Sequence, residues 1–164
     1  LPFYYLQLSS IDRPSWPWFR DSQRRLMDAI PHTGMAVSSD YGDSLDVHPK
    51  NKRPIGERLA HWALNRTYDK KQVVPSGPLF RSVDFREDAA YVSFDYADGL
   101  HTADGRPIRE FEIAETEGVY YPAKAEVVGN QVKVYSDRVK HPCHVRYAWR
   151  PFTWANLVLS LIHI

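Results

Sequence analysis

The sequence predicts an α/β unit followed by an all-β unit, on three observations. Apolar runs at residues 3–8 and 34–38 are typical of buried strands, and residues 18–30 and 53–68 have apolar side chains at helical spacing. Strands that alternate with helices predict a parallel sheet covered by helices. Further along the chain, short β-rich segments separated by turn residues predict a sandwich of the jelly-roll type.

The two helices are predicted from their first turns as well as from their apolar stripes. In the first helix, Pro17 suits the first helical position, Ser15 is a nearby cap, and Phe19, Leu26 and Ile30 form the stripe expected to face the core. In the second helix, Pro54 fits the first turn. Its expected core stripe consists of Ile55, Leu59, Trp62, Ala63 and Arg66.

The second part of the chain is divided by turn signals. Val73–Pro78 has the composition of a linker, and Gly129-Asn130 separates two β-rich runs as in a hairpin. The predicted strands are Phe80–Phe85, Ala90–Tyr96, Glu110–Ile113, Val119–Val128, Gln131–Tyr135 and Cys143–Trp149. We therefore expect an α/β domain over residues 1–72 and a β-sandwich domain over 73–158.

Composition excludes several classes of protein. The net charge is +1 and the basic residues are scattered, so we expect no nucleic-acid partner. No stretch approaches the roughly 20 apolar residues of a membrane span, so we expect no membrane partner. A single cysteine, Cys143, allows no intrachain disulfide and is expected to be a small buried side chain. No cofactor-binding motif is present, and we expect no cofactor.

Both ends of the chain are unusual. LPFYYLQL, at residues 1–8, is an apolar run typical of a core strand, without a lead-in or an initiator Met, so we expect that an N-terminal part of the same chain is missing. LSLIHI, at 159–164, is also the translation of a transposon end used in sequencing libraries. We therefore expect residues 159–164 to be a non-native tail of an open reading frame from a short assembled contig.

The loop from Tyr41 to Lys50 contains GDSL, letters that name a class of serine esterases. An esterase serine sits where a strand turns directly into a helix, so that backbone N–H groups can hold the oxyanion. Ser44 lacks that setting, because the next predicted helix begins only at Arg53. We therefore interpret Ser44 as a loop serine.

His48, in the same loop, is the better candidate for catalysis. Asp46 stands two residues before it, and Asp40 and Asp43 are within reach. A carboxylate beside an imidazole fixes its tautomer and stabilises the imidazolium, while Pro49 restricts His48 to extended geometry. Two other interpretations stay open: a solvated surface histidine, or a metal site of Asp40, Asp46 and His48. The metal site is disfavoured because no second ligand pair has recognisable metal spacing.

The segments GMAVSSDYGDSLDVHPKNK with GERLAHWAL, YADGLHTADGRPIREFEIA and YYPAKAEVVGNQVKVYS resemble the C-terminal half of bacterial sialate O-acetylesterases, members of the SGNH-hydrolase superfamily. The resemblance runs from residue 1 to about 157. It implies a flavodoxin-like parallel sheet followed by a β-sandwich, and a Ser/His enzyme that removes acetyl groups from sugar hydroxyls. The implied partner is therefore an O-acetylated sugar or glycan, and the family implies export from the bacterial cytoplasm.

The family's D-I-H-P-K-N-K segment maps onto residues 46–52, which makes His48 the implied general base and Asp46 its orienting carboxylate. Many superfamily members have Asp three residues before the His, where this chain has Leu45, so Asp43 is the alternative. The family's nucleophilic Ser and its oxyanion-hole Gly and Asn map before Leu1, so we expect the chain alone to be inactive. The competing hypothesis is a non-catalytic carbohydrate-binding or structural β-module.

Overall fold

The computed structural model describes residues 1–159 and 162–163, and its chain forms two compact units. Unit 1 consists of Leu1–Ser76 and Arg150–Thr153, and unit 2 of Gly77–Trp149 and the chain from Trp154 onward. The protein is thus a mixed α/β structure with mostly antiparallel sheets and few helices. The return of Arg150–Thr153 to unit 1 was not predicted from the sequence.

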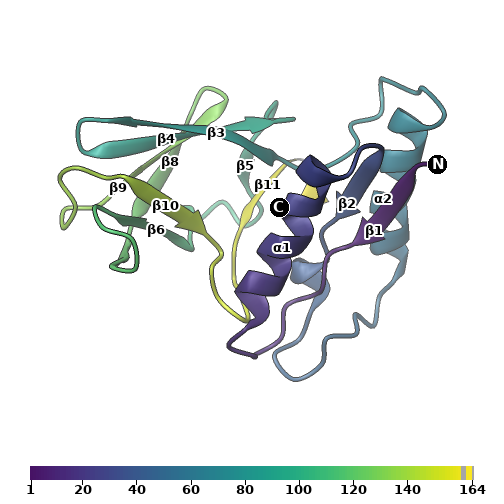
Figure 1. The fold of residues 1–164 in the computed structure, drawn as a ribbon, viewed down its shortest axis with the longest axis horizontal. Coiled ribbons are helices and arrows are strands. Elements are labelled where there is room, and N and C mark those ends of the chain that lie inside the picture. Colours follow the sequence, from purple (N-terminus) through teal and green to yellow (C-terminus); the bar gives the residue numbers. More distant parts are fainter. Residues whose placement is uncertain (160–161, 164) are drawn as a thin grey trace. The chain divides into compact units, whose positions relative to one another are not determined.

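Unit 1 is a parallel pair of strands with two helices. Its elements are β1 (Phe3–Leu6), α1 (Trp16–Ala29), β2 (Thr33–Ala36), a 3₁₀ turn (Ser39–Tyr41) and α2 (Arg53–Arg66). β1 and β2 pair in parallel with Phe3 opposite Thr33, and one helix lies on each face of the pair (Figure 1). The predicted parallel strands are confirmed, although both are shorter than the apolar runs that predicted them.

The predicted orientation of α1 is wrong. Its apolar residues Phe19, Leu26 and Ile30 are exposed, whereas Arg20 is buried. The reason lies in the segment after β1, whose polar groups need partners once they are covered. The Gln7 amide nitrogen donates to the carbonyl of Arg20 at 2.9 Å. Hydrogen bonding to this segment therefore sets which face of α1 is turned inward.

The orientation of α2 was predicted in part. Ile55 and Trp62 are buried as expected, but Arg66 is exposed and the polar Arg58 and Asn65 are buried instead. Helical spacing alone does not show which Arg of the helix is buried, because burial of a charge depends on the partner that it meets.

Trp62 fixes the distance between α2 and the strand pair. Its indole Nε1 donates to the carbonyl of Met35 at 2.9 Å, and its ring packs over Gly34. A Cβ on Gly34 would lie 2.5 Å from ring atom Cδ2, which is closer than real Cβ contacts. This glycine is therefore required by the close approach of the helix to β2.

Unit 2 consists of antiparallel strands. They are β3 (Leu79–Arg86), β4 (Ala89–Asp95), β5 (His101–Thr102), β6 (Phe111–Ala114), β7 (Tyr121–Pro122), β8 (Lys124–Val128), β9 (Gln131–Tyr135), β10 (His144–Tyr147), β11 (Leu157–Leu159) and β12 (Ile162–His163). They form three sheets in the orders β3-β4-β9-β8, β10-β6-β7 and β12-β11-β5, where the sequence predicted a sandwich. The predicted hairpin around Gly129-Asn130 is confirmed as β8–β9.

Two features of unit 2 differ from the prediction. The predicted strand Val119–Val128 is wrong, since β7 and β8 lie in different sheets, with Ala123 between them donating its N–H to the carbonyl of Phe111. The prediction of a buried Cys143 is also wrong, because this residue is exposed. It precedes β10, so it lies just outside the strand to which the sequence assigned it.

The core of unit 2 is aliphatic. Ile113, Val132, Val134 and Val139 have no exposed surface, and strands from all three sheets contribute to the same cluster. Leu159, the first residue of the expected tail, belongs to this cluster as the last residue of β11. The pairing of Leu159 in a strand does not test whether residues 159–164 are native or non-native. Within it, residues 160, 161 and 164 lie outside the described residues.

In the described part of the chain, no helix is long and apolar enough to cross a bilayer.

Candidate active site

The loop that carries His48 follows the carboxyl end of β2, which is the edge of a parallel sheet where ligands usually bind. β2 ends at Ala36, the 3₁₀ turn follows, and the chain then runs without regular structure until α2 begins at Arg53. Pro49 is the buried residue of this loop, so the chain is anchored directly after His48.

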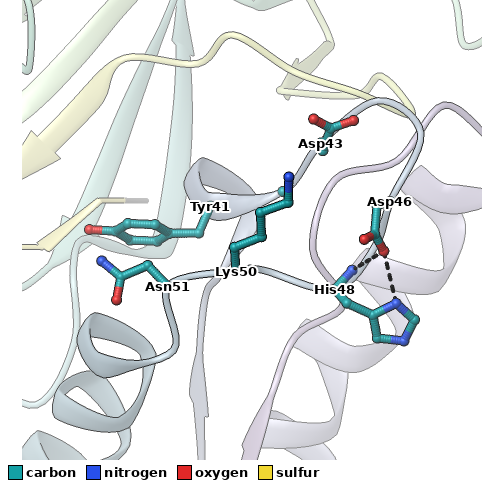
Figure 2. Close-up of a pocket in the computed structure, with 7 residues that line it drawn as sticks. Tyr41, Asp43, Asp46, His48, Lys50 and Asn51 are labelled. Carbon is teal, nitrogen blue, oxygen red and sulfur yellow. Dashed lines mark hydrogen bonds and ion pairs between the residues drawn. The ribbon is translucent and has the colours of Figure 1, made fainter.

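Asp46 and His48 form a closed pair within this loop. The carboxylate atom Oδ1 of Asp46 accepts the backbone N–H of His48 at 2.9 Å and lies 2.8 Å from ring atom Nδ1 (Figure 2). The two side chains are 50% and 81% exposed, respectively. Because a carboxylate accepts hydrogen bonds, Nδ1 carries the proton in the neutral ring and Nε2 carries the lone pair.

The same contacts act on the acidity of Asp46. Its pKa is lowered, chiefly by the hydrogen bond from the backbone N–H of His48 and then by the bond to the His48 ring. Both bonds favour the charged form of the carboxyl group. Asp46 is therefore ionised at neutral pH and stands ready to stabilise a positive charge on the imidazole.

Asp43 has a different role in the loop. Its Oδ1 accepts the backbone N–H of Leu45 at 2.9 Å, and its own N–H donates to the carbonyl of Asp46 at 3.2 Å. Of the two carboxylates that the sequence left as alternatives, it is Asp46 that contacts the ring of His48.

Asp40 is directed toward the second helix rather than toward His48. Its two carboxylate oxygens accept hydrogen bonds from the Arg58 guanidinium, each at 2.7 Å. Among the described residues, no group of three or more His, Cys, Asp or Glu side chains is arranged to hold a metal ion. The geometry thus gives no support to a metal site of Asp40, Asp46 and His48.

A pocket lies along the loop and includes the Asp46–His48 pair at one end (Figure 2). Its lining residues are Tyr41, Gly42, Asp43, Asp46, His48, Lys50 and Asn51. These lining residues, all within the described chain, include no Ser, Thr or Cys. The pocket therefore offers a base and polar groups but no serine, threonine or cysteine nucleophile of its own.

Ser44 is placed as a loop residue. It is exposed, its carbonyl accepts the N–H of Asp12 at 3.0 Å, and no helix begins after it before Arg53. The strand-to-helix turn that an esterase serine requires is therefore not formed at this position.

Arg58 is the residue of this site that sequence analysis missed. It lies between Ile55 and Trp62 on the buried face of α2, so its position at helical spacing from both was the available signal. The predicted core stripe included Arg66 and left out Arg58, although a buried Arg is stable where a carboxylate meets it.

Comparison with known proteins gives one informative result. No protein-family model matches the chain, and no curated protein matches it. Among solved structures, the chain is similar to the crystal structure of a novel carbohydrate acetylesterase from Xanthomonas citri, with a TM-score of 0.89 and 36% sequence identity. The match covers 98% of this chain and 39% of the esterase chain. This chain is thus similar, over nearly all its length, to about two fifths of a carbohydrate acetylesterase.

Proposed function

We propose that this chain is the part of a carbohydrate O-acetylesterase that supplies the His and Asp of a Ser-His-Asp triad. The observation that carries the proposal is the Asp46–His48 pair, with Nδ1 bound to a carboxylate at 2.8 Å in a pocket after a parallel strand. The similarity to a carbohydrate acetylesterase over 98% of the chain supports the reaction class.

In this proposal His48 is the general base. Its Nε2 accepts the proton of a serine hydroxyl as the serine oxygen bonds to the acetyl carbonyl carbon, and Asp46 stabilises the imidazolium. When the ester C–O bond breaks, Nε2 returns the proton to the departing sugar oxygen. A water molecule then repeats the sequence, so that acetate is released and the serine regains its proton.

The nucleophile in this proposal comes from polypeptide outside residues 1–164. The pocket contains no Ser, Thr or Cys among its lining residues, and the chain spans 39% of the length of the similar esterase. We propose that β1 and β2 belong to a larger flavodoxin-like parallel sheet of the SGNH type. We further propose an O-acetylated sialate as substrate, which is the finer specificity implied by the resemblance to sialate O-acetylesterases.

The test uses a longer protein in which the polypeptide encoded upstream, in frame, precedes Leu1. We expect His48→Ala to lower the kcat for acetate release from O-acetylated sialate by about 10³–10⁶-fold, because members of a triad act as a unit. The matched control is His101→Ala, since His101 is also exposed and its Nδ1 lies 2.7 Å from an oxygen two residues earlier, the Gly99 carbonyl. Turnover that survives His48→Ala, with both variants folded, would show that this histidine is not the base.

Substrate choice is tested in the same protein. We expect faster acetate release from O-acetylated sialate than from acetylated xylan at equal concentration of ester groups. The reverse order would overturn the sialate proposal while leaving the esterase proposal in place. Binding of sugar without any acetate release would instead favour the non-catalytic module.

A further inference from the structure

Arg58 of α2 and Asp40 of the 3₁₀ turn form a paired contact between the two elements that flank the His48 loop. Arg58 Nη1 donates to Asp40 Oδ1, and Nη2 donates to Oδ2, both at 2.7 Å. The side chains are only 8% and 16% exposed. This two-bonded geometry fixes the relative orientation of the two groups as well as their distance.

The same guanidinium binds the chain at two further points. Nη1 also donates to the carbonyl of Val37 at 2.8 Å, and the guanidinium carbon lies 5.2 Å from the centre of the Tyr41 ring. One side chain of α2 therefore holds the segment from Val37 to Tyr41, where the loop leaves β2.

Contacts continue from this segment toward His48. A Cβ on Gly42 would lie 2.5 Å from the carbonyl oxygen of Ser10, so the backbone here packs directly on the segment after β1. Two residues later, the carbonyl of Ser44 accepts the N–H of Asp12 at 3.0 Å. The N–H of Asp43 then donates to the carbonyl of Asp46. Arg58 thus acts at one end of a connected path that ends at the backbone of Asp46, the residue whose carboxylate contacts His48.

Stabilisation of the fold alone does not explain why a buried Arg58–Asp40 pair is present. Desolvation of two charges offsets much of their attraction, so a buried ion pair is often no more stabilising than apolar side chains of the same volume. What apolar side chains could not replace is the orientation that the pair imposes, because its two parallel hydrogen bonds require one arrangement of the guanidinium and the carboxylate.

We propose that Arg58 and Asp40 are positioning residues that set the conformation of the loop presenting His48. This inference rests on the proposed role of His48. It assigns no contact with substrate to either residue. Their effect is exerted through the backbone from Val37 to Asp46.

The test is made on the 164-residue chain itself, by NMR of ¹³C,¹⁵N-labelled protein. The carboxyl pKa of Asp46 and the ring tautomer of His48 are measured in the wild type, in Arg58→Gln and in Asp40→Asn. We expect both variants to raise the Asp46 pKa toward its ordinary value and to lower the population of the Nδ1–H tautomer of His48. The reason is that the hydrogen bonds between His48 and Asp46 would be formed in a smaller fraction of molecules. The double variant should change the Asp46 pKa and the His48 tautomer no more than either single variant does, since the two side chains act through one contact.

Two further variants separate positioning from a general effect. Arg58→Lys should restore the His48 tautomer only in part, because an ammonium group cannot make the paired contact of a guanidinium. Arg53→Gln is the matched control, because Arg53 also lies on α2 and pairs with a carboxylate, Glu57, but at the surface. Arg53→Gln should leave the Asp46 pKa and the His48 tautomer unchanged.

Wild-type values of the Asp46 pKa and His48 tautomer in folded Arg58→Gln would overturn the proposal, even with a lower melting temperature. The Trp62 indole resonance reports whether unit 1 remains folded. If Arg58→Gln is unfolded, Asp40→Asn decides, since it removes the charge with little change of volume. Unfolding of both would also overturn the proposal, because the pair would then be required for the fold as a whole. No ester hydrolysis is measured, so failure here leaves the esterase proposal standing.

Discussion

The two compact units bury different kinds of side chain. In unit 2 the residues without exposed surface are aliphatic, such as Ile113, Val132 and Val134. In unit 1 the buried set includes Ser9, Ser10 and Ser38, together with two arginines. Burial of apolar surface is therefore the main stabilising term for unit 2, whereas unit 1 depends more on satisfied hydrogen bonds, which specify geometry.

The polar interior of unit 1 forms a connected network. The hydroxyl groups of Ser9 and Ser38 are 2.6 Å apart, and Ser38 donates to the carbonyl of Gln7 at 2.9 Å. Arg20 reaches the hydroxyl of Ser10 at 3.1 Å and donates to the carbonyl of Arg150. Burial lowers the pKa of Arg20 to about 10. This network joins the segments that follow β1 and β2. The backbone from which the His48 loop begins is therefore held in place by hydrogen bonds.

The surface of unit 1 shows the reverse pattern. Large apolar side chains are exposed there, and they include Leu1, Phe3, Trp18, Phe19, Leu26 and Ile30. Unit 1 thus places polar groups inside and apolar groups outside more than unit 2 does. This contrast agrees with the proposal that the parallel sheet continues into further polypeptide.

The largest expected difference between the units comes from the same substitution made in each. Ile113→Ala should lower the free energy of unfolding of unit 2 by about 2–5 kcal/mol, because it opens a cavity in a closed core. Ile30→Ala, at a residue that is 48% exposed, should change the free energy of unfolding of unit 1 by less than about 0.5 kcal/mol. Urea unfolding followed by tryptophan fluorescence and by amide exchange measures both. A loss of unfolding free energy in Ile30→Ala as large as that in Ile113→Ala would contradict this difference between the two units.

A pair of glycine substitutions tests where unit 1 is tightly packed. Gly34→Ala should destabilise unit 1 by about 1–3 kcal/mol, because the new methyl group overlaps the ring of Trp62. Gly56→Ala should stabilise it by about 0.5–1 kcal/mol, since nothing lies within 4 Å and alanine favours the helix. Thermal unfolding of the two variants is the measurement. A stable Gly34→Ala would mean that α2 can move away from β2.

The smallest effect concerns two exposed carboxylates, one from each unit. The pKa of Asp46 is lowered by hydrogen bonds from His48, and that of Glu115 by the backbone N–H groups of His141 and Lys140. A carboxyl pKa lowered on folding stabilises the fold above its unfolded value, and that stabilisation is lost as pH falls through the folded-state pKa. Both contributions should therefore disappear in acid.

His48→Ala separates the two carboxylates. It removes the ring contact at Asp46, so the Asp46 pKa should rise in a carboxyl NMR titration while that of Glu115 stays as before. An unchanged Asp46 pKa would show that the ring contributes nothing to the pair.

Sequence patterns predicted what depends on local signals. The parallel pair β1–β2 followed from two apolar runs, and the β8–β9 hairpin followed from Gly129-Asn130. The spacing of Asp46 and His48 indicated a candidate site, the family resemblance selected it over the alternatives, and the structure brings the two side chains together.

What could not be predicted depends on partners distant in the chain. β5 and β11 are short and pair with each other across more than fifty residues, so neither has a strong local pattern. Arg20 and Arg58 are buried because they meet Ser10 and Asp40, respectively, and helical spacing does not reveal these partners. The apolar face of α1 predicted burial, whereas the hydrogen bonds of the segment after β1 decided its orientation.

The central claim is that His48 activates a serine lying outside residues 1–164, and a fluorophosphonate probe tests it most directly. Such a probe bonds its phosphorus to an activated serine oxygen and releases fluoride, and mass spectrometry locates the labelled residue. In the longer protein we expect one labelled serine, located before Leu1, with labelling lost in His48→Ala and kept in His101→Ala. Labelling at Ser44, or labelling that does not depend on His48, would contradict the account.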